Sequence, residues 1–513
     1  FWRQELKGAV GPQFPRMPSR DFVPTPDAMV ERIIPLETGS GSPFTLATLI
    51  RGAWALVASQ YSGSDDVLFG ETLTGRDISL VGVESIVGPL IATVPIRIRI
   101  NRTSTLESFL QSVQQSILAR TPYQHMGWQN IRKVSQDAQH ASEAPTGLVI
   151  QPEPEYVGND LGFELGDVVR EALHFNPYPL MVGCGIRRDG FRVCANFDSS
   201  LIEIPQMERI LAQLEVACSQ LTKDLSRTVG EVSCLPESEL NQIWKWNQTP
   251  PLAFDESTKR LGATANTKQG SVYPSAAVLW VCDSRNSSYL TPIGSVGELW
   301  LESNFLPGDV VESPAWLLAG SSSYPGRVGK AQATGDLVEL RADGSLAFIA
   351  RKDNFLPIQG HAVDFADLEA HVARYLPPAT RGATAVMQSS PESNQEIVVF
   401  IDQRPSLEDS VNVLTEDHRV QGSETTIRAS IPVELAVALK KLDKYIHDSL
   451  PSYVAPSAYI VIDNLPTNKA GQIDHDRLNQ LASNISSEVL IQLRQGLEQA
   501  WSTGAAQTQL TVP

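Results

Sequence analysis

Ile91-Ala92-Thr93-Val94-Pro95-Ile96-Arg97-Ile98-Arg99-Ile100 alternates apolar residues with polar or basic ones. Because successive side chains of a β-strand point to opposite faces, this period of two predicts a strand with one buried face and with Arg97 and Arg99 on the other. Residues 66–70 predict a second strand. The helix predicted at 44–59 is apolar around most of its circumference, so we expect it to be buried.

Helices and strands continue in mixed order through the first 225 residues. We expect helices at 106–118 and 205–221, and strands at 147–151 and 191–197. Five residues of the second helix should face inward: Ile210, Leu211, Leu214, Val216 and Cys218. This mixed order predicts an α/β sandwich layer.

The bulk composition narrows the class of protein. The chain has 513 residues, of which 42% are hydrophobic and 19% charged, with a formal net charge of −17; this is typical of a soluble protein with several domains. Nucleic-acid binding needs clustered Lys and Arg, so we expect no nucleic-acid partner. The longest apolar runs are too short to cross a bilayer, so we expect no membrane span.

Cysteine and histidine usage indicates the compartment. The five cysteines are widely spaced, without a Cys-x-x-Cys pair, and the eight histidines are scattered singly. We expect buried thiols in a reducing, cytoplasmic compartment, and no metal site. The chain starts at Phe1 without Met or a signal region, which predicts a segment cut from a longer protein.

The second half divides by composition. Residues 226–272, almost wholly polar from 255 to 271, are expected to be a linker and a deletion junction. A small β-rich unit is predicted over 273–352, with a hairpin turn at Asp343-Gly344. Its strands are expected at 276–282, 297–302, 336–340 and 345–350.

An α+β unit is expected over 353–482. A helix at 364–375 precedes strands at 383–387 and 397–401, and the polar, acidic stretch 403–430 favours a mobile loop. Residues 483–513 predict a helix, with an apolar face over 488–501, followed by a linker from 502 toward an absent carrier domain.

The run Val87-Gly88-Pro89-Leu90-Ile91-Ala92-Thr93-Val94-Pro95-Ile96-Arg97, preceded by Thr74-Gly75-Arg76-Asp77, resembles condensation domains of nonribosomal peptide synthetases, fungal ones in particular. Further matches to the second lobe of that domain occur in the same order, at Phe1-Trp2 with Leu6-Lys7-Gly8, Tyr123-Gln124-His125-Met126-Gly127 and Asn196-Phe197-Asp198-Ser199-Ser200-Leu201-Ile202. The resemblance implies that 1–225 is a C-terminal condensation lobe with a chloramphenicol-acetyltransferase-like fold. Such a lobe forms one wall of the channel through which a carrier-bound acceptor amine reaches a donor thioester.

The catalytic motif of that family, His-His-x-x-x-Asp-Gly, belongs to the first lobe, and no adjacent pair of histidines occurs in this sequence. The chain therefore has no evident general base or positioning group for the amine. His125 and His174 are the alternatives. We expect both to be structural, because an isolated histidine usually lacks the partner that orients a catalytic base.

The second half resembles an adenylation domain that has lost most of its large subdomain. The matching motifs are Ile293-Gly294-Ser295-Val296-Gly297-Glu298-Leu299-Trp300, Thr334-Gly335-Asp336-Leu337, Ala350-Arg351-Lys352-Asp353 and Leu465-Pro466-Thr467-Asn468-Lys469-Ala470-Gly471-Gln472-Ile473-Asp474. The resemblance implies vestigial ribose contacts at Asp336 and Arg351 and a hinge at Asp353. Taken alone, Thr-Gly-Asp-Leu is also an ordinary turn with an Asx-type carboxylate.

Departures from the adenylation pattern concern the phosphate contacts. The phosphate loop, amino-acid pocket and magnesium-binding acid should lie between Pro251 and Tyr273, where the sequence has only a short polar connector. Gln472 stands where the family has a catalytic Lys, and an amide supplies no full positive charge. Lys469 lies on a turn that makes it a poor substitute. Gln359 replaces an Arg, and Ala333 replaces a basic residue.

We therefore expect no catalytic residues and no confidently bound cofactor, although the family uses ATP, Mg²⁺ and a phosphopantetheine on a carrier domain. The leading hypothesis is a synthetase segment whose partners are the upstream first lobe and carrier domains with a thioester-bound amino acid or peptide. Alone, it should neither adenylate nor condense. Two alternatives are a non-catalytic scaffold that docks carrier domains, and an excision of the large subdomain from an active parent.

Overall fold

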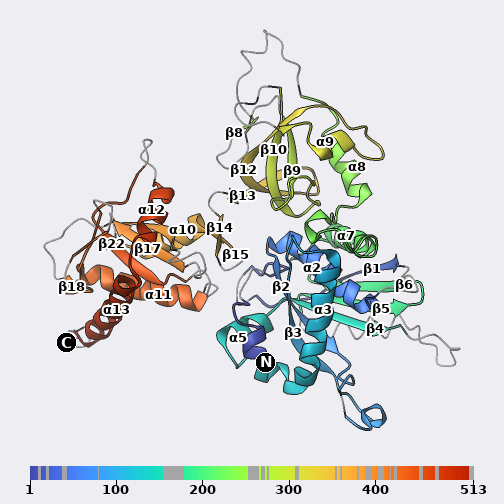
Figure 1. The fold of residues 1–513 in the computed structure, drawn as a ribbon, viewed down its shortest axis with the longest axis horizontal. Helices are drawn as coiled ribbons and strands as arrows, with labels where there is room; N and C mark the ends of the chain where they lie inside the picture. The colour runs from blue at the N-terminus through green and yellow to red at the C-terminus, as the bar shows by residue number, and fades with distance from the viewer. Residues whose placement is uncertain are drawn as a thin grey trace. The chain divides into compact units, whose positions relative to one another are not determined.

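In a computed structural model of the chain, a six-stranded sheet forms the centre of the N-terminal lobe, residues 1–235 (Figure 1). The strands lie in the order β1-β6-β5-β4-β2-β3. Strand β4 pairs in parallel with both β2 and β5, whereas the other neighbours are antiparallel. The bounds are β1 (Ala28–Pro35), β2 (Asp66–Leu73), β3 (Ala92–Arg99), β4 (Thr146–Pro152), β5 (Leu180–Arg187) and β6 (Gly190–Phe197).

The structure describes residues 1–507 with internal gaps. Nothing is described for 10–12, 19–21, 37–42, 79, 154–177, 252–264, 267–271, 274–276, 305, 307–310, 353–354, 359–360, 378–379, 388–395, 403–409, 416, 421–424, 450–454 and 468–472. The chain divides into two compact units, Phe1–Lys352 and Asp353–Pro513. The first contains the N-terminal lobe and a β unit (residues 236–352), and we call the second the C-terminal unit.

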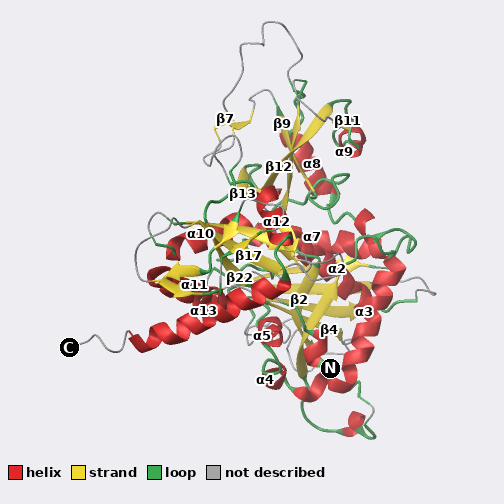
Figure 2. Cartoon of the chain, turned by 60° about the vertical axis from the view of Figure 1, so that its left-hand side comes forward, coloured by secondary structure: helices red, strands yellow, loops and turns green. Residues whose placement is uncertain are grey.

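Three long helices pack on one face of the six-stranded sheet (Figure 2). They are α2 (Leu46–Ser62), α3 (Leu106–Arg120) and α7 (Ile204–Leu221); the shorter helices are α1 (Trp2–Glu5), α4 (Trp128–Ile131) and α5 (Gln136–Ser142). Every residue of α2 from Thr48 to Gln60 is buried, which confirms the predicted buried helix. Alternate residues of β6, such as Phe191 and Phe197, complete this core.

Some expectations for the lobe differ from the structure. Strands β1 and β5 were not predicted, and Val216 is only half-buried. Arg97 does not lie on a polar face: it is buried because its guanidinium binds both carboxylate oxygens of Asp66 and three backbone carbonyls. A strand covered on both faces can include a charge only when such partners satisfy it.

The β unit has a five-stranded sheet in the order β11-β12-β10-β9, with β13 paired to β12. Its elements are α8 (Glu237–Trp246), β7 (Ala265–Asn266), β8 (Val272–Tyr273), β9 (Val278–Cys282), β10 (Val296–Glu302), β11 (Val311–Glu312), α9 (Ala315–Ala319), β12 (Lys330–Leu340) and β13 (Leu346–Arg351). The hairpin predicted at Asp343-Gly344 joins β12 to β13, and Gly344 has a φ of +83°, which suits a tight turn.

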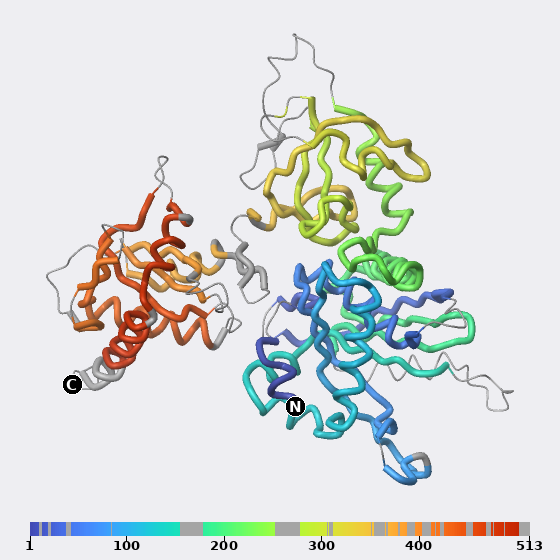
Figure 3. The backbone as a smooth tube through the Cα atoms, viewed as in Figure 1, coloured from blue at the N-terminus to red at the C-terminus, as the bar shows by residue number. Residues whose placement is uncertain are grey.

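Helix α8 lies inside the stretch 226–272 that we expected to be a linker. Figure 3 traces the chain from α7 through this helix into the β unit. Trp244 of α8 is buried against Trp280, with the ring centroids 4.9 Å apart, and Arg327 lies over both rings. The apolar side chains of Leu240, Ile243, Trp244 and Trp246 pack this otherwise polar helix against the core of the β unit.

The C-terminal unit has a sheet in the order β16-β17-β22-β20-β19. Its elements are β14 (Phe355–Ile358), β15 (His361–Asp364), α10 (Phe365–Tyr375), β16 (Arg381–Met387), β17 (Glu396–Asp402), β18 (Ser410–Asn412), β19 (His418–Arg419), β20 (Thr426–Ile427), β21 (Ser430–Pro432), α11 (Val433–Ser449), β22 (Ala458–Ile462), α12 (His475–Ser483) and α13 (Ser487–Gln507). Short strands therefore occupy described parts of 403–430, where a mobile loop was expected. The last helix was predicted correctly over 488–501 but continues to Gln507 instead of giving way to a linker at 502.

Two predictions about the whole chain can be compared with the described residues. All five cysteines are buried and free, as expected. Among the described residues, no helix is both long and apolar enough to span a bilayer.

Candidate functional site

The motif Thr334-Gly335-Asp336-Leu337 lies in a β-bulge of β12, and the turn considered as an alternative is not present there. Residues 334–336 lie opposite Leu299 of β10 alone, and Gly335 adopts a φ of +76° that costs glycine little. The Thr334 hydroxyl fixes the bulge: it donates to the Leu299 carbonyl over 2.9 Å and accepts the Asp336 N–H over 3.0 Å. This bulge determines where the Asp336 carboxylate sits.

Asp336 and Arg351, the two residues that the resemblance places at a ribose, lie next to each other. They are register partners on β12 and β13, and Arg351 Nη1 is 2.9 Å from Asp336 Oδ1. The same Nη1 donates to the Thr334 carbonyl over 2.9 Å. The Asp336 side chain is 4% exposed and that of Arg351 45% exposed, so the pair is reached by solvent from the arginine side.

A second ion pair borders the first. Lys352 Nζ is 2.7 Å from Glu298 Oε2, and Glu298 is almost completely buried in β10. The sequence pattern does not predict this pair. The available signal was an acidic residue within an otherwise apolar strand, because buried carboxylates require a cationic or hydrogen-bonding partner.

These residues do not fit a magnesium nucleotide. Polyphosphate binding needs cations or backbone N–H groups that face the phosphates, but Arg351 and Lys352 are each paired with a buried carboxylate. In the described part of the chain, no group of three or more His, Cys, Asp or Glu residues could hold a metal ion. Neither the Arg351 nor the Lys352 side chain is therefore available to neutralise a triphosphate in this arrangement.

Several residues singled out from the sequence lie outside the described residues: Asp353, Gln359, Lys469, Gln472 and His174. Their expected roles stay predictions. Ala333 is described and is exposed on β12.

His125 has a structural contact in the N-terminal lobe. Its Nε2 is 2.8 Å from the carbonyl of Gly75, at the start of the connection between β2 and β3. Gly75 has a φ of +71°, and a methyl group there would lie 1.7 Å from the Leu90 carbonyl, so only glycine fits. His125 thus holds the base of the loop that follows.

The loop 80–91 projects apolar side chains into solvent. Val81 and Val87 are fully exposed, and Leu80 and Ile91 are more than half exposed. Arg76 holds the loop by donating to the carbonyls of Val83, Ile86 and Gly88 over 2.9, 3.2 and 2.9 Å. A fixed loop that presents apolar side chains is typical of an interaction surface. We call it the apolar loop.

A buried ion triad lies between the helices and the sheet. Glu71 of β2 is completely buried and accepts hydrogen bonds from Arg51 of α2 and Arg120 of α3. Burial lowers the pKa of Arg120 to about 10, while Glu71 opposes that change. Because these charges are paired inside the core, we assign them to structure; the sequence gives no periodic signal for them.

Comparison with known proteins adds to this geometry. Residues 36–244, which contain β2 to β6 and the three long helices, match the condensation domain family. The matched stretch contains α7 and ends within α8, while the lobe boundary expected at residue 225 stays a prediction.

The whole chain is 66% identical over 517 aligned residues to "Nonribosomal peptide synthetase sidD" of Aspergillus fumigatus, and covers 25% of that protein. It is 37% identical over 365 residues to "Nonribosomal peptide synthetase 1" of Ajellomyces capsulatus, an alignment that covers 69% of this chain and 20% of that one. The chain thus spans about a quarter or less of the relatives it matches.

A solved four-domain nonribosomal peptide synthetase bound to AMP and glycine has a similar fold. The TM-score is 0.54 at 11% sequence identity, and the match covers 93% of this chain and 57% of that one. The two proteins thus share a mixed α/β fold, and at this identity the likeness shows the fold alone.

Proposed function

We propose that this chain is an internal segment of a nonribosomal peptide synthetase that assembles a secondary-metabolite peptide, and that its N-terminal lobe supplies the acceptor side of a peptide-bond-forming condensation domain. One observation carries the proposal: five of the six strands of the lobe's sheet, β2 to β6, lie in the stretch that matches the condensation domain family. The partners would be carrier domains that present a thioester-bound amino acid or peptide, and the first condensation lobe.

The apolar loop supports a missing partner lobe. Val81 and Val87 are fully exposed, yet Arg76 and His125 fix the backbone of the loop, so its conformation does not depend on a partner. A preformed apolar surface loses little conformational entropy on docking. We propose that the first lobe, with the His-His-x-x-x-Asp-Gly motif that this sequence lacks, covers this loop.

Reconstitution tests the condensation role. A first lobe from the Aspergillus fumigatus relative, added as a separate chain with loaded donor and acceptor carrier domains, should give a condensed product by mass spectrometry only when this chain is also present. Val87→Asp should abolish the product, whereas Val328→Asp should not, because Val328 is a similarly exposed residue of the β unit. Carrier binding without any product, even with a stable first lobe, would contradict condensation and support the scaffold alternative.

We also propose that residues 273–482 are an adenylation remnant that does not activate amino acids, with 273–352 from the large subdomain and 353–482 as the C-terminal subdomain. Two observations support this proposal. Arg351 and Lys352 are each paired with a buried carboxylate, and Gln472 stands in place of the family lysine. An ATP–pyrophosphate exchange assay across the amino acids should give only background. Clear exchange with any amino acid would contradict this part of the proposal and favour an active parent.

A further inference from the structure

The turn after β9 carries side chains from the β unit into the N-terminal lobe. Its backbone is closed by a 2.9 Å hydrogen bond from Asp283 N–H to the Tyr289 carbonyl. Asp283 Oδ1 also accepts the Arg285 N–H over 2.9 Å and its Nε–H over 3.2 Å. The turn therefore fixes the direction of the Arg285 side chain before it meets the lobe.

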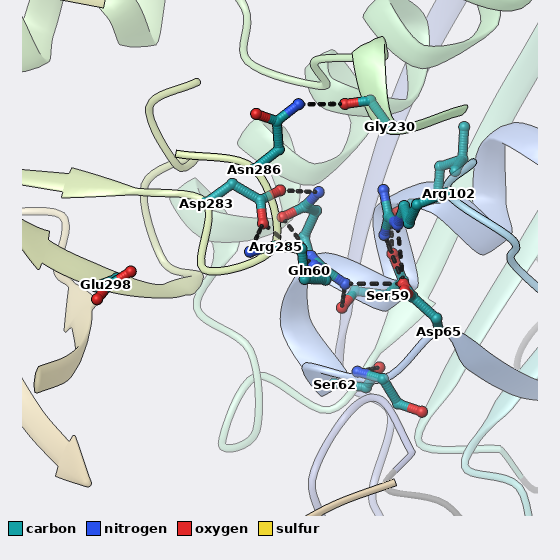
Figure 4. Close-up of polar contacts among 12 residues, drawn as sticks. Ser59, Gln60, Ser62, Asp65, Arg102, Gly230, Asp283, Arg285, Asn286 and Glu298 are labelled. Atoms are coloured by element: carbon teal, nitrogen blue, oxygen red, sulfur yellow. Dashed lines mark hydrogen bonds and ion pairs between the residues drawn. The ribbon is translucent and has the colours of Figure 1, made fainter. Parts of the chain in front are cut away.

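Arg285 reaches the carboxyl end of α2, as Figure 4 shows. Its Nη1 lies 3.2 Å from the Ser59 carbonyl and 3.1 Å from Asp65 Oδ1, and its Nη2 lies 2.9 Å from Gln60 Oε1. Gln60 Nε2 donates in return to Asp283 Oδ2 over 3.2 Å. The Ser59 carbonyl already accepts the Gly63 N–H over 3.0 Å, so Arg285 is a second donor to it, and a cation is favoured at the carboxyl end of a helix. Arg285 supplies both a donor and the charge.

The charges at this contact are retained despite burial. Burial opposes the ionisation of Asp283, yet Arg285 and the backbone N–H of residue 285 hold the pKa of Asp283 below its ordinary value. On the other side, Arg102 donates to Asp65 Oδ1 from Nε and Nη2 over 3.0 and 2.7 Å. The β unit and the N-terminal lobe are thus joined by one row of alternating charges: Asp283, Arg285, Asp65 and Arg102.

Two further hydrogen bonds join the β unit to the N-terminal lobe. Asn286 Nδ2 donates to the Gly230 carbonyl over 2.7 Å, and Gln206 Nε2 of α7 donates to the Ile293 carbonyl over 3.0 Å. The approach is close, because a methyl group at Gly294 would lie 2.3 Å from the Gln206 amide. The β unit therefore contacts α2, α7 and the 3₁₀ turn at Val229–Glu231 at once.

We propose that the β unit serves as a brace for the condensation lobe, with Arg285 capping the carboxyl end of the central helix α2. Helix α2 is the most deeply buried helix of the lobe core, and it packs on both α3 and α7. Fixing its last turn limits movement of the helix layer against the sheet. This function needs no nucleotide, so it gives a reason for a β unit to persist after amino-acid activation is lost.

Hydrogen exchange on the full chain tests the brace, with Arg285→Met compared with Arg32→Met. Arg32 makes an exposed ion pair with Glu215, so it matches the chemistry of the substitution without touching the β unit. In Arg285→Met, the amides in the last turn of α2 should exchange about 30-fold faster, which corresponds to about 2 kcal/mol at 1.4 kcal/mol per factor of ten. In Arg285→Lys, the exchange rate of the same amides should lie between the rates in Arg285→Met and Arg32→Met.

Unchanged exchange in α2 of Arg285→Met, with faster exchange confined to the β unit, would overturn the brace, as would an equal effect of Arg32→Met. Should Arg285→Met fail to fold, Asn286→Ala provides a milder test, because it removes the contact to Gly230 and otherwise only a hydrogen bond within the turn, from the Ser288 N–H to Asn286 Oδ1. Exchange at residues 229–231 should then rise a few-fold, and no rise would contradict the proposal. The measurement uses no substrate, so it is independent of whether the chain condenses peptides.

Discussion

Glu239 makes the stability of the first unit depend on pH near neutrality. This residue of α8 is 5% exposed, and its two carboxylate oxygens accept from Gln213 Nε2 over 3.0 Å and from the Ile293 N–H over 2.8 Å. Burial raises the pKa of Glu239 from 4.5 to about 7, although both hydrogen bonds and Arg209 act in the opposite direction. Desolvation of the carboxylate is therefore the dominant effect.

The sign follows from proton binding. Between about pH 4.5 and 7 the folded chain holds a proton on Glu239 that the unfolded chain has released, so the free energy of unfolding falls as pH rises through this window. At 1.36 kcal/mol per tenfold change, the fall amounts to about 3 kcal/mol and is complete above the folded pKa. Glu239→Gln removes the titrating group while keeping its shape.

Urea unfolding followed by pulse proteolysis, with fragments of residues 1–352 resolved, measures this effect. The difference in unfolding free energy between wild type and Glu239→Gln should fall by about 3 kcal/mol from pH 4.5 to pH 8. Glu208→Gln, at an exposed position of α7, should show no such trend. A difference that stays constant with pH, or that rises, would refute the argument that desolvation outweighs the hydrogen bonds.

Three further variants test the packing. Arg97→Met should lower the free energy of unfolding by about 3–5 kcal/mol, because Asp66 then stays buried without its partner. Arg99→Met, at the exposed end of the same strand, should be almost neutral in the same urea assay, and equal losses would contradict the buried assignment of Arg97. Gly147→Ala should lower the free energy of unfolding by about 1–3 kcal/mol in a thermal assay, because the added methyl would lie 2.6 Å from the Tyr178 ring. Gly185→Ala should lower it less, because its methyl would lie 3.3 Å from Glu153 Cβ. Arg351→Met should cost only about 1 kcal/mol because Arg351 is half exposed, and a loss as large as that of Arg97→Met would show that the pair carries more of the fold than its exposure implies.

Local periodicity was sufficient for most elements of the condensation lobe. The helix at 44–59 and the strand at 91–100 were predicted within a few residues, because burial of one side chain after another leaves a regular pattern. The same pattern failed at Arg97, whose partners Asp66 and the carbonyls of residues 5, 7 and 8 lie far away in sequence. Long-range charge pairing has no period.

The same reason explains which contacts of the candidate site could be predicted from the sequence and which could not. Asp336 and Arg351 were expected to act together from motif resemblance, and they are register partners. The pairing of Glu298 with Lys352 and the insertion of Arg285 at α2 could not be predicted, because each depends on two segments that approach only in the folded chain. Helix α8 was missed although Leu240, Ile243 and Trp244 have helical spacing, because the helix has only 10 residues and lies in a polar background.

Calorimetric titration of the full chain with ATP and magnesium tests most directly whether the second half has lost its nucleotide chemistry. With Arg351 and Lys352 held by buried carboxylates, the titration should show only heats of dilution, in wild type and in Arg351→Met alike. Saturable binding with a micromolar Kd would contradict the remnant and require phosphate contacts elsewhere in the chain.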